Sequence, residues 1–246
     1  GNLQRIKKIP MKGINLILLT GDIGKADLAR KRFFENIKRK KQGLPELKKD
    51  AQFMKEVYWE IHYSTINLLK YLSKFAPVYS ILGNVGENMI KDFEIKKDEK
   101  KYGIKFPYLG REIKKLKKFH LIRNRFRKIS NIRIGFLEYF VDTCWIKEFK
   151  PNDYEKSMKK AKKETIKAKR ILNNFGHLDI LICHQPPYGY LDKVNFPGIP
   201  KHWKDKHAGS KVILNHIKKY QPKYVFCGHI HEGEGKTKIG KTEIYN

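Results

Sequence analysis

The hydrophobic and polar positions along the 246-residue chain follow two alternating patterns. Four short, nearly continuous apolar runs are typical of strands covered on both faces, and they span residues 14–20, 78–82, 178–183 and 225–227. Between them lie predicted helices, most with apolar residues at helical spacing, over residues 26–41, 47–75, 154–175 and 211–220. Strands that alternate with helices in this way predict an α/β fold.

Two further segments predict antiparallel pairs of strands. Alternation over residues 120–123 and 132–137 indicates one pair, with its turn near Ser130. Residues 236–245 predict a closing hairpin that turns at Gly240. Because the first pair follows two α/β units, we expect a second sheet packed on the first.

Two polar residues directly precede predicted helices. Asp153 stands before the helix over 154–175, and Ser210 before the helix over 211–220. Side chains of this kind accept hydrogen bonds from the first free backbone N–H groups of a helix, so we expect both residues to act as caps.

Each apolar run is followed by a side chain that can bind a metal ion. Asp22, Asn84 and His184 follow the first three runs, and His229 and His231 follow the fourth. On an extended backbone, two histidines two positions apart point to the same face. Taken alone, Asp22 is equally a helix cap, and the histidine pair equally a solvated loop residue with a strand cap.

Parallel strands would bring these tips to one sheet edge, where an aspartate, an amide and three imidazoles converge. A set of nitrogen and oxygen ligands without thiolates favours Mn, Fe or Zn over a structural cysteine-type zinc site. Five such ligands exceed the needs of one tetrahedral ion. Two ions roughly 3.5–4 Å apart that share the aspartate would use them, and this geometry suits in-line attack on a phosphoester.

Composition adds a strong positive charge. Lys and Arg number 54 against 25 Asp and Glu, a formal net charge of +29 that would attract nucleic acid. The lysines are spread over almost every predicted helix and loop, however, which a lysine-rich genome or a heat-adapted surface also produces. We favour that interpretation.

The cysteines and the hydropathy pattern bear on the compartment. Cys144, Cys183 and Cys227 are widely separated, which predicts buried free thiols in a reducing compartment. No apolar stretch reaches the roughly 18 residues of a membrane span, and no basic-then-apolar leader opens the chain. We expect a soluble, cytoplasmic protein without a membrane partner.

The motifs Gly21-Asp22, Gly83-Asn84, His184 and Gly228-His229-Ile230-His231, in this order, resemble the calcineurin-like metallophosphoesterase superfamily. The resemblance implies a four-layer α-β-β-α sandwich, as a single domain over residues 1–246. It also implies two divalent transition-metal ions, Mn first and Fe, Zn or Ni as alternatives. Asp22 would bridge them, Asn84, His184 and His229 would hold one, and His231 the other. Asn84 would also act in catalysis by orienting a phosphate oxygen.

The sequence departs from the family pattern in two ways. The family opens with a strand that ends in Asp-x-His, and here the chain begins at Gly1-Asn2-Leu3, so we expect that the first strand and the extreme C-terminus are missing. The family often has a histidine directly after the asparagine, where this chain has Val85. His207 and His202 could approach substrate from the loop after Pro187, although a solvated basic loop is an equal alternative.

Three functions follow from the resemblance. The first is hydrolysis of phosphomonoesters or phosphodiesters, with a metal-bridging hydroxide as the nucleophile. The second is a nuclease of the same fold, which the positive charge permits. The third is a catalytically weak or inactive scaffold, similar to the retromer subunit of this fold, which Val85 favours.

Overall fold

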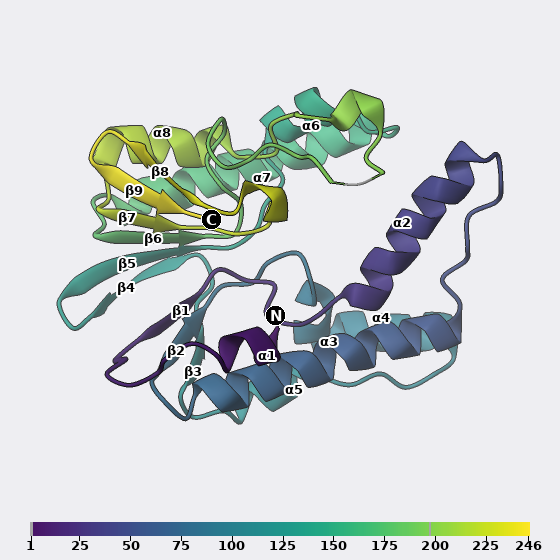
Figure 1. Cartoon of the computed structure of the whole chain (residues 1–246), viewed down its shortest axis with the longest axis horizontal. Helices are drawn as coiled ribbons and strands as arrows, with labels where there is room; N and C mark the ends of the chain where they lie inside the picture. The colour runs from purple at the N-terminus through teal and green to yellow at the C-terminus, as the bar shows by residue number, and fades with distance from the viewer. Residues whose placement is uncertain (1, 197) are drawn as a thin grey trace. The chain divides into compact units, whose positions relative to one another are not determined.

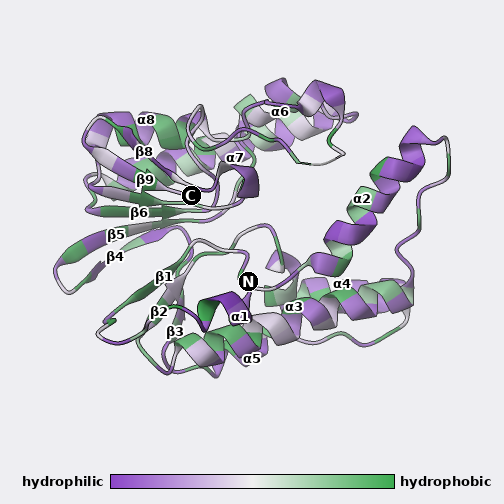
Figure 2. Ribbon diagram, in the orientation of Figure 1, coloured by the Kyte–Doolittle hydropathy of each residue, from purple (hydrophilic) through white to green (hydrophobic). Residues whose placement is uncertain are grey.

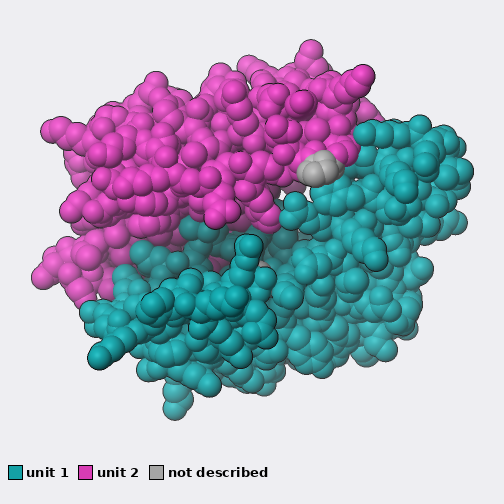
Figure 3. Space-filling model, viewed as in Figure 1, with its two compact units in different colours: residues 1–79, 83–120 teal, residues 80–82, 121–246 magenta. Residues whose placement is uncertain are grey.

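The computed structural model describes residues 2–196 and 198–246. The chain divides into two compact units (Figure 3). Unit 1 comprises residues 1–79 and 83–120, and unit 2 comprises residues 80–82 and 121–246. The strands form a three-stranded sheet in the order β1-β2-β3 and a six-stranded sheet in the order β4-β5-β6-β7-β9-β8. The single domain predicted over residues 1–246 stays a prediction.

Unit 1 is mainly helical. Its elements, including two strands that end in unit 2, are α1 (Leu3–Ile6), β1 (Ile17–Leu19), α2 (Asp27–Lys41), α3 (Ala51–Leu72), β2 (Val78–Ser80), η1 (Glu87–Ile90), α4 (Asp92–Tyr102), α5 (Leu109–Lys114) and β3 (Phe119–Leu121). Helix α3 begins later than predicted because the Asp50 side chain accepts the Phe53 N–H at 2.8 Å and caps it. By contrast, α2 has no buried residue and is mostly hydrophilic (Figure 2).

Unit 2 contains the larger sheet. Its elements are β4 (Arg125–Ile129), β5 (Ile132–Leu137), α6 (Thr143–Phe149), α7 (Tyr154–Phe175), β6 (Ile180–Cys183), η2 (Lys201–Trp203), α8 (Lys211–Tyr220), β7 (Tyr224–Phe226), η3 (His231–Gly233), β8 (Lys236–Ile239) and β9 (Thr242–Tyr245). Strands β5, β6, β7 and β9 run parallel, and β4 and β8 pair antiparallel at the two edges. Helices α7 and α8 lie on one face of this sheet (Figure 1).

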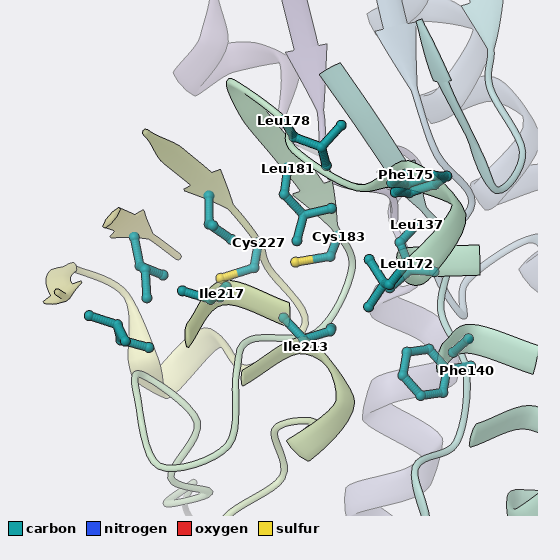
Figure 4. Close-up of a cluster of buried hydrophobic side chains, with 14 residues drawn as sticks. Leu137, Phe140, Leu172, Phe175, Leu178, Leu181, Cys183, Ile213, Ile217 and Cys227 are labelled. Carbon is teal, nitrogen blue, oxygen red and sulfur yellow. The ribbon is translucent and has the colours of Figure 1, made fainter. Parts of the chain in front are cut away.

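The core of unit 2 fills the space between that sheet face and the two helices (Figure 4). Leu172 and Phe175 of α7 and Ile213 and Ile217 of α8 pack against buried strand residues such as Leu181. All four helix residues are at most 2% exposed. The helical spacing of these apolar residues therefore fixes both helices on the sheet, with their polar faces outward.

The first predicted strand pair was partly wrong. The turn is at Ser130 and Asn131, both with positive φ, but the strand that pairs with β5 is β4 and not residues 120–123. Those residues overlap β3, which belongs to the three-stranded sheet. A turn of two residues requires the strand that ends directly before it, so the nearer segment forms the hairpin. The hairpin of β8 and β9, with its turn at Gly240, is confirmed.

The two expected helix caps differ. The Ser210 hydroxyl accepts the Ile213 N–H at 3.2 Å and caps α8 as predicted. Asp153 occupies the N-cap position of α7 but makes no capping hydrogen bond, because its carboxylate accepts the Ser157 hydroxyl at 2.8 Å instead. The prediction for Asp153 was therefore wrong.

Two expectations about compartment can be compared with the structure. Cys144, Cys183 and Cys227 are all buried and free, as predicted. Within the described part of the chain, none of the helices combines the length and apolar character that crossing a membrane requires.

Candidate metal centre

In unit 1, Asp22 lies in the loop after β1 and contacts the loop after β2. Its carboxylate accepts the backbone N–H of Val85 at 2.8 Å. Asp22 has a φ of +45°, a left-handed conformation that aspartate adopts more readily than most residues. Asn84, the residue before Val85, is exposed. The tips that follow β1 and β2 therefore lie together and present an aspartate and an amide.

The loop that carries Asp22 is tied to helix α3. The Ser64 hydroxyl accepts the Lys25 N–H at 2.7 Å, and the Glu60 carboxylate accepts the Leu28 N–H at 3.1 Å. Gly24 lies so close to α3 that a Cβ added there would meet Thr65 Oγ1 at 2.5 Å. A glycine is required at this position because any side chain would push the loop away from the helix.

In unit 2, two of the predicted ligands lie side by side. The rings of His184 and His229 have centroids 4.9 Å apart, and each offers a ligand nitrogen within 4.8 Å of the other. His184 follows β6 directly and is only 1% exposed. Tyr139 contacts both rings, at centroid distances of 5.6 Å to His184 and 5.1 Å to His229. The tyrosine therefore limits the orientations that the two imidazoles can take.

The backbone at His229 is not extended. The Gly228 C=O accepts the Ile230 N–H at 2.9 Å, and His229 between them has a φ of +73°. This combination describes a γ-turn, a rare and strained conformation that recurs at functional sites. The expectation that His229 and His231 share one face of an extended strand was wrong, because the chain turns at His229 and His231 opens η3.

The turn is held from both sides. The Gly228 N–H donates to the His184 C=O at 2.9 Å and so links the ends of β6 and β7. The Asn246 amide donates to the Ile230 C=O at 2.7 Å. His231 is exposed, in contrast to His184. The structure thus places His229 on a constrained turn and His231 at its open end.

The thiols nearest in sequence to these histidines point elsewhere. Cys183 and Cys227 belong to the hydrophobic core between sheet and helices (Figure 4). Neighbouring residues of a strand point to opposite faces, so the Cys183 side chain and the imidazole of His184 leave the backbone on different sides. Burial raises the pKa of both thiols well above the usual value. The donors available for a metal are imidazole nitrogens and oxygens, a set that suits divalent transition metals.

His207 is engaged by a residue that the sequence reasoning missed. Its Nδ1 lies 2.7 Å from a carboxylate oxygen of Asp192, which is 1% exposed. The other Asp192 oxygen accepts the N–H groups of Gly189 and Gly209 at 2.9 and 3.0 Å. A substrate would therefore meet the Nε2 atom of His207. The predicted role of His207 in substrate binding, and that of His202 on η2, stay predictions.

Tyr139 was also missed, although a signal for it exists. It follows β5 by two residues and so lies at the carboxyl end of a parallel strand, where side chains of functional sites gather. Hydropathy patterning places an aromatic residue in the core by default, and that is why it was not singled out.

Comparison with known proteins assigns the family. A profile described as calcineurin-like phosphoesterase matches residues 2–233. The chain belongs to this family. Membership confirms the resemblance drawn from the four motifs, and with it the α/β fold class of the calcineurin-like phosphoesterases. Binding of divalent metal ions is general in this family, and the histidine pair described above suits it.

Individual relatives match only a short segment. Human metallophosphoesterase domain-containing protein 1 is 41% identical over 70 residues, which are 28% of this chain and 19% of that protein. A UPF0046 protein of Caenorhabditis elegans is 34% identical over 68 residues, 28% of this chain and 20% of the relative. The chain thus matches about a fifth of the length of these relatives. The match to one crystal structure covers 96% of this chain and 80% of the other chain, with a TM-score of 0.48 and 15% sequence identity.

Proposed function

We propose that this calcineurin-like phosphoesterase hydrolyses phosphomonoesters or phosphodiesters with two divalent metal ions. The observation that carries the proposal is the pair of imidazoles of His184 and His229. Their ligand nitrogens lie within 4.8 Å of each other, and Tyr139 contacts both rings. Two histidines held in this way, without a nearby thiolate, favour a transition metal with nitrogen and oxygen ligands.

Asp22, His184 and His229 each offer one ligand atom. Asp22 would be shared by the two ions, and Asn84, His184 and His229 would hold one of them. His231 would serve the other ion. Mn is the first choice, with Fe, Zn or Ni as alternatives. When bound, the ions would activate water as a nucleophile and stabilise charge on the phosphoryl oxygens.

The residues of the chain would position the substrate and the ligands. The Val85 N–H holds one oxygen of Asp22 and so fixes the direction of its carboxylate. Asn84, exposed beside it, would orient a phosphate oxygen. Val85 cannot donate a proton through its side chain, so the leaving group would take its proton from water. This favours substrates with acidic leaving groups, such as aryl phosphodiesters.

A second candidate is a nuclease of the same fold. The net charge of +29 supports it, because a polyanion would be attracted to such a surface. Binding that weakens steeply with salt, together with cleavage of single-stranded or duplex substrates, would distinguish the nuclease from an enzyme acting on small molecules. A weak or inactive scaffold remains the third candidate, because Val85 stands where the family often has a histidine. A cytoplasmic location stays a prediction.

The test is turnover of bis-p-nitrophenyl phosphate by the chain loaded with Mn. We expect turnover by the unsubstituted chain, and a loss of about a hundredfold or more in Asp22→Asn and in His229→Ala. Turnover unchanged by both substitutions would refute the assignment.

A matched control guards against loss of folding. His120→Ala removes an exposed imidazole on β3 that has no proposed role in binding metal or substrate, and we expect it to keep full turnover. Metal content of the same four proteins, measured after dialysis, should fall in Asp22→Asn and His229→Ala only. A chain that binds Mn as proposed but shows no turnover would support the scaffold instead.

A further inference from the structure

Helix α2 and the segment that follows it, residues 27–50, form an arm of unit 1 that is held along one side. Asn36 pairs with the backbone of Leu47 in both directions: its amide donates to the Leu47 C=O at 3.3 Å, and its side-chain oxygen accepts the Leu47 N–H at 2.8 Å. Arg39, three positions further on the same side of the helix, donates to the Pro45 C=O at 2.7 Å. The returning segment therefore covers this side of α2 and leaves the opposite side open.

The open side of α2 is basic. Five exposed cations and one exposed aromatic residue lie on this helix, namely Arg30, Lys31, Phe33, Lys38, Lys40 and Lys41. Lys31 and Lys38 are seven positions apart and so lie on one side of the helix, about 10 Å from each other along its axis. Phe33 and Lys40 are related in the same way. Within residues 2–196 and 198–246, the lysines at 31, 38 and 40 form no ion pair with a carboxylate.

Helix α7 is also rich in lysine, but its cations have a structural explanation. Five of its residues are buried, so its lysines form the solvated face of a helix that packs on the sheet. By contrast, α2 has no buried residue, and Figure 2 shows it as hydrophilic along most of its length. A short polar helix is marginally stable in water, and like charges three or four positions apart weaken it further. An anionic partner along the open side would remove this repulsion.

The exposed aromatic ring narrows the class of partner. Phe33 is 48% exposed and lies on the same side of α2 as Lys40. A helix that binds a membrane surface needs an apolar face separate from its cations, whereas here the ring lies among them. Cations that follow a phosphate backbone, together with an aromatic ring on which a base can stack, are the combination that binds single-stranded nucleic acid.

We propose that the open side of this arm binds single-stranded nucleic acid. Lys31, Lys38 and Lys40 contact phosphates of the strand, and the ring of Phe33 stacks on an unpaired base. A duplex keeps its bases inside the stack, so a single strand fits both features of the arm. The inference goes beyond the proposed hydrolysis and needs no metal ion, so the two can fail separately.

The test is fluorescence anisotropy with a labelled oligothymidylate of about 20 nucleotides, near 0.1 M salt. EDTA is present, so that no cleavage occurs whether or not the chain is a phosphoesterase. We expect saturable binding that weakens linearly on a plot of log affinity against log salt. Duplex DNA of the same length and polyglutamate should both bind more weakly than the single strand. Absence of saturable binding, tighter binding of the duplex, or equal binding of polyglutamate would overturn the proposal.

A charge-reversed variant tests the lysines of the arm. It combines Lys31→Glu, Lys38→Glu and Lys40→Glu, all at exposed positions. Loss of three phosphate contacts should weaken binding about a hundredfold near 0.1 M salt, and should reduce the slope against log salt by about two.

The matched control makes the same charge change on α7. It combines Lys159→Glu, Lys163→Glu and Lys167→Glu, also exposed and on a basic helix. Because distant surface charges are screened at this salt concentration, binding should stay within about threefold of the unsubstituted chain. Equal loss in the two variants would mean that the oligonucleotide binds the general positive surface, and would overturn the assignment to the arm.

Phe33 provides an independent readout. Phe33→Ala should weaken binding of the oligothymidylate about tenfold and leave binding of the duplex unchanged, because only an unpaired base can stack on the ring. Phe33→Tyr keeps an aromatic ring and should restore binding. Unchanged binding of the single strand in Phe33→Ala would overturn the stacking contact. Phosphatidylserine vesicles that bind more tightly than the oligonucleotide, and lose binding in Phe33→Ala, would assign the arm to a membrane instead.

Discussion

The two units hold their candidate ligands in different ways. In unit 1, Asp22 is fixed through backbone contacts, since its carboxylate takes the Val85 N–H and its loop is tied to α3. In unit 2, His184 and His229 are fixed through their own rings, which contact each other and Tyr139. A substitution in unit 1 therefore acts on the position of a loop, whereas one in unit 2 acts on packing and chemistry together.

Removing one proposed ligand from each unit tests this contrast most directly. His184→Ala deletes a ring that is 1% exposed, and should cost about 2–4 kcal/mol of unfolding free energy in urea. Asn84→Ala, at an exposed position, should stay within about 0.5 kcal/mol. Both variants should lose phosphodiester turnover by about a hundredfold. Equal free energies of unfolding for His184→Ala and Asn84→Ala would contradict the difference between the two units.

Buried histidines extend the comparison to pH. His216 in unit 2 has a pKa of about 4 against the usual 6.5, so between these values the unfolded chain binds more protons than the folded one. Stability should therefore fall as the pH drops from 6.5 to about 4, by up to about 3 kcal/mol from this residue. Above pH 6.5 it contributes no further change.

The variant His216→Leu isolates this contribution. Urea titrations between pH 7.5 and 4.5 should show a smaller loss of stability in the variant than in the unsubstituted chain. Some dependence should persist from His62 in unit 1, whose pKa is also lowered by burial and partly restored by Glu112. Parallel pH curves for the two proteins would mean that His216 is not neutral in the folded state.

A glycine substitution tests how the loop that carries Asp22 in unit 1 is held. In Gly24→Ala the new methyl group would meet α3, which should cost about 1–3 kcal/mol and displace Asp22, so turnover should fall. Gly43→Ala is the control, because its Cβ would meet nothing within 4 Å. It has a φ of +71°, so it should lose about 1 kcal/mol but keep full turnover. A full turnover in Gly24→Ala would show that Asp22 does not depend on this contact.

The helices and caps that depend on local sequence were the most predictable. Helix α7 has the bounds expected from its apolar spacing, and the Ser210 cap of α8 follows from a residue type and its position. The predicted cap at Asp153 was wrong because the Ser157 hydroxyl donates to the same carboxylate, and sequence spacing alone does not reveal this contact. The partner of β5 also depended on turn geometry, which the alternation over 120–123 obscured.

The candidate site was predictable as a set of residues but not as a geometry. The four motifs identified the ligand-type residues because each follows an apolar run. The γ-turn at His229, the Val85 N–H on Asp22 and the Asp192 contact of His207 depend on contacts between distant segments. Such contacts leave no periodic trace in a sequence, and they decide which atom of each side chain remains for a metal or a substrate.

The order of the six-stranded sheet gives part of the basic charge a definite use. Its two outermost strands are β4 and β8, and both carry exposed cations, Arg125, Arg127 and Lys128 on one and Lys236 and Lys238 on the other. A bare strand edge invites further strands from other molecules, and charged side chains along it repel a second copy. The chain therefore protects itself from edge-to-edge aggregation with the same residues that raise its net charge, whatever anions it binds.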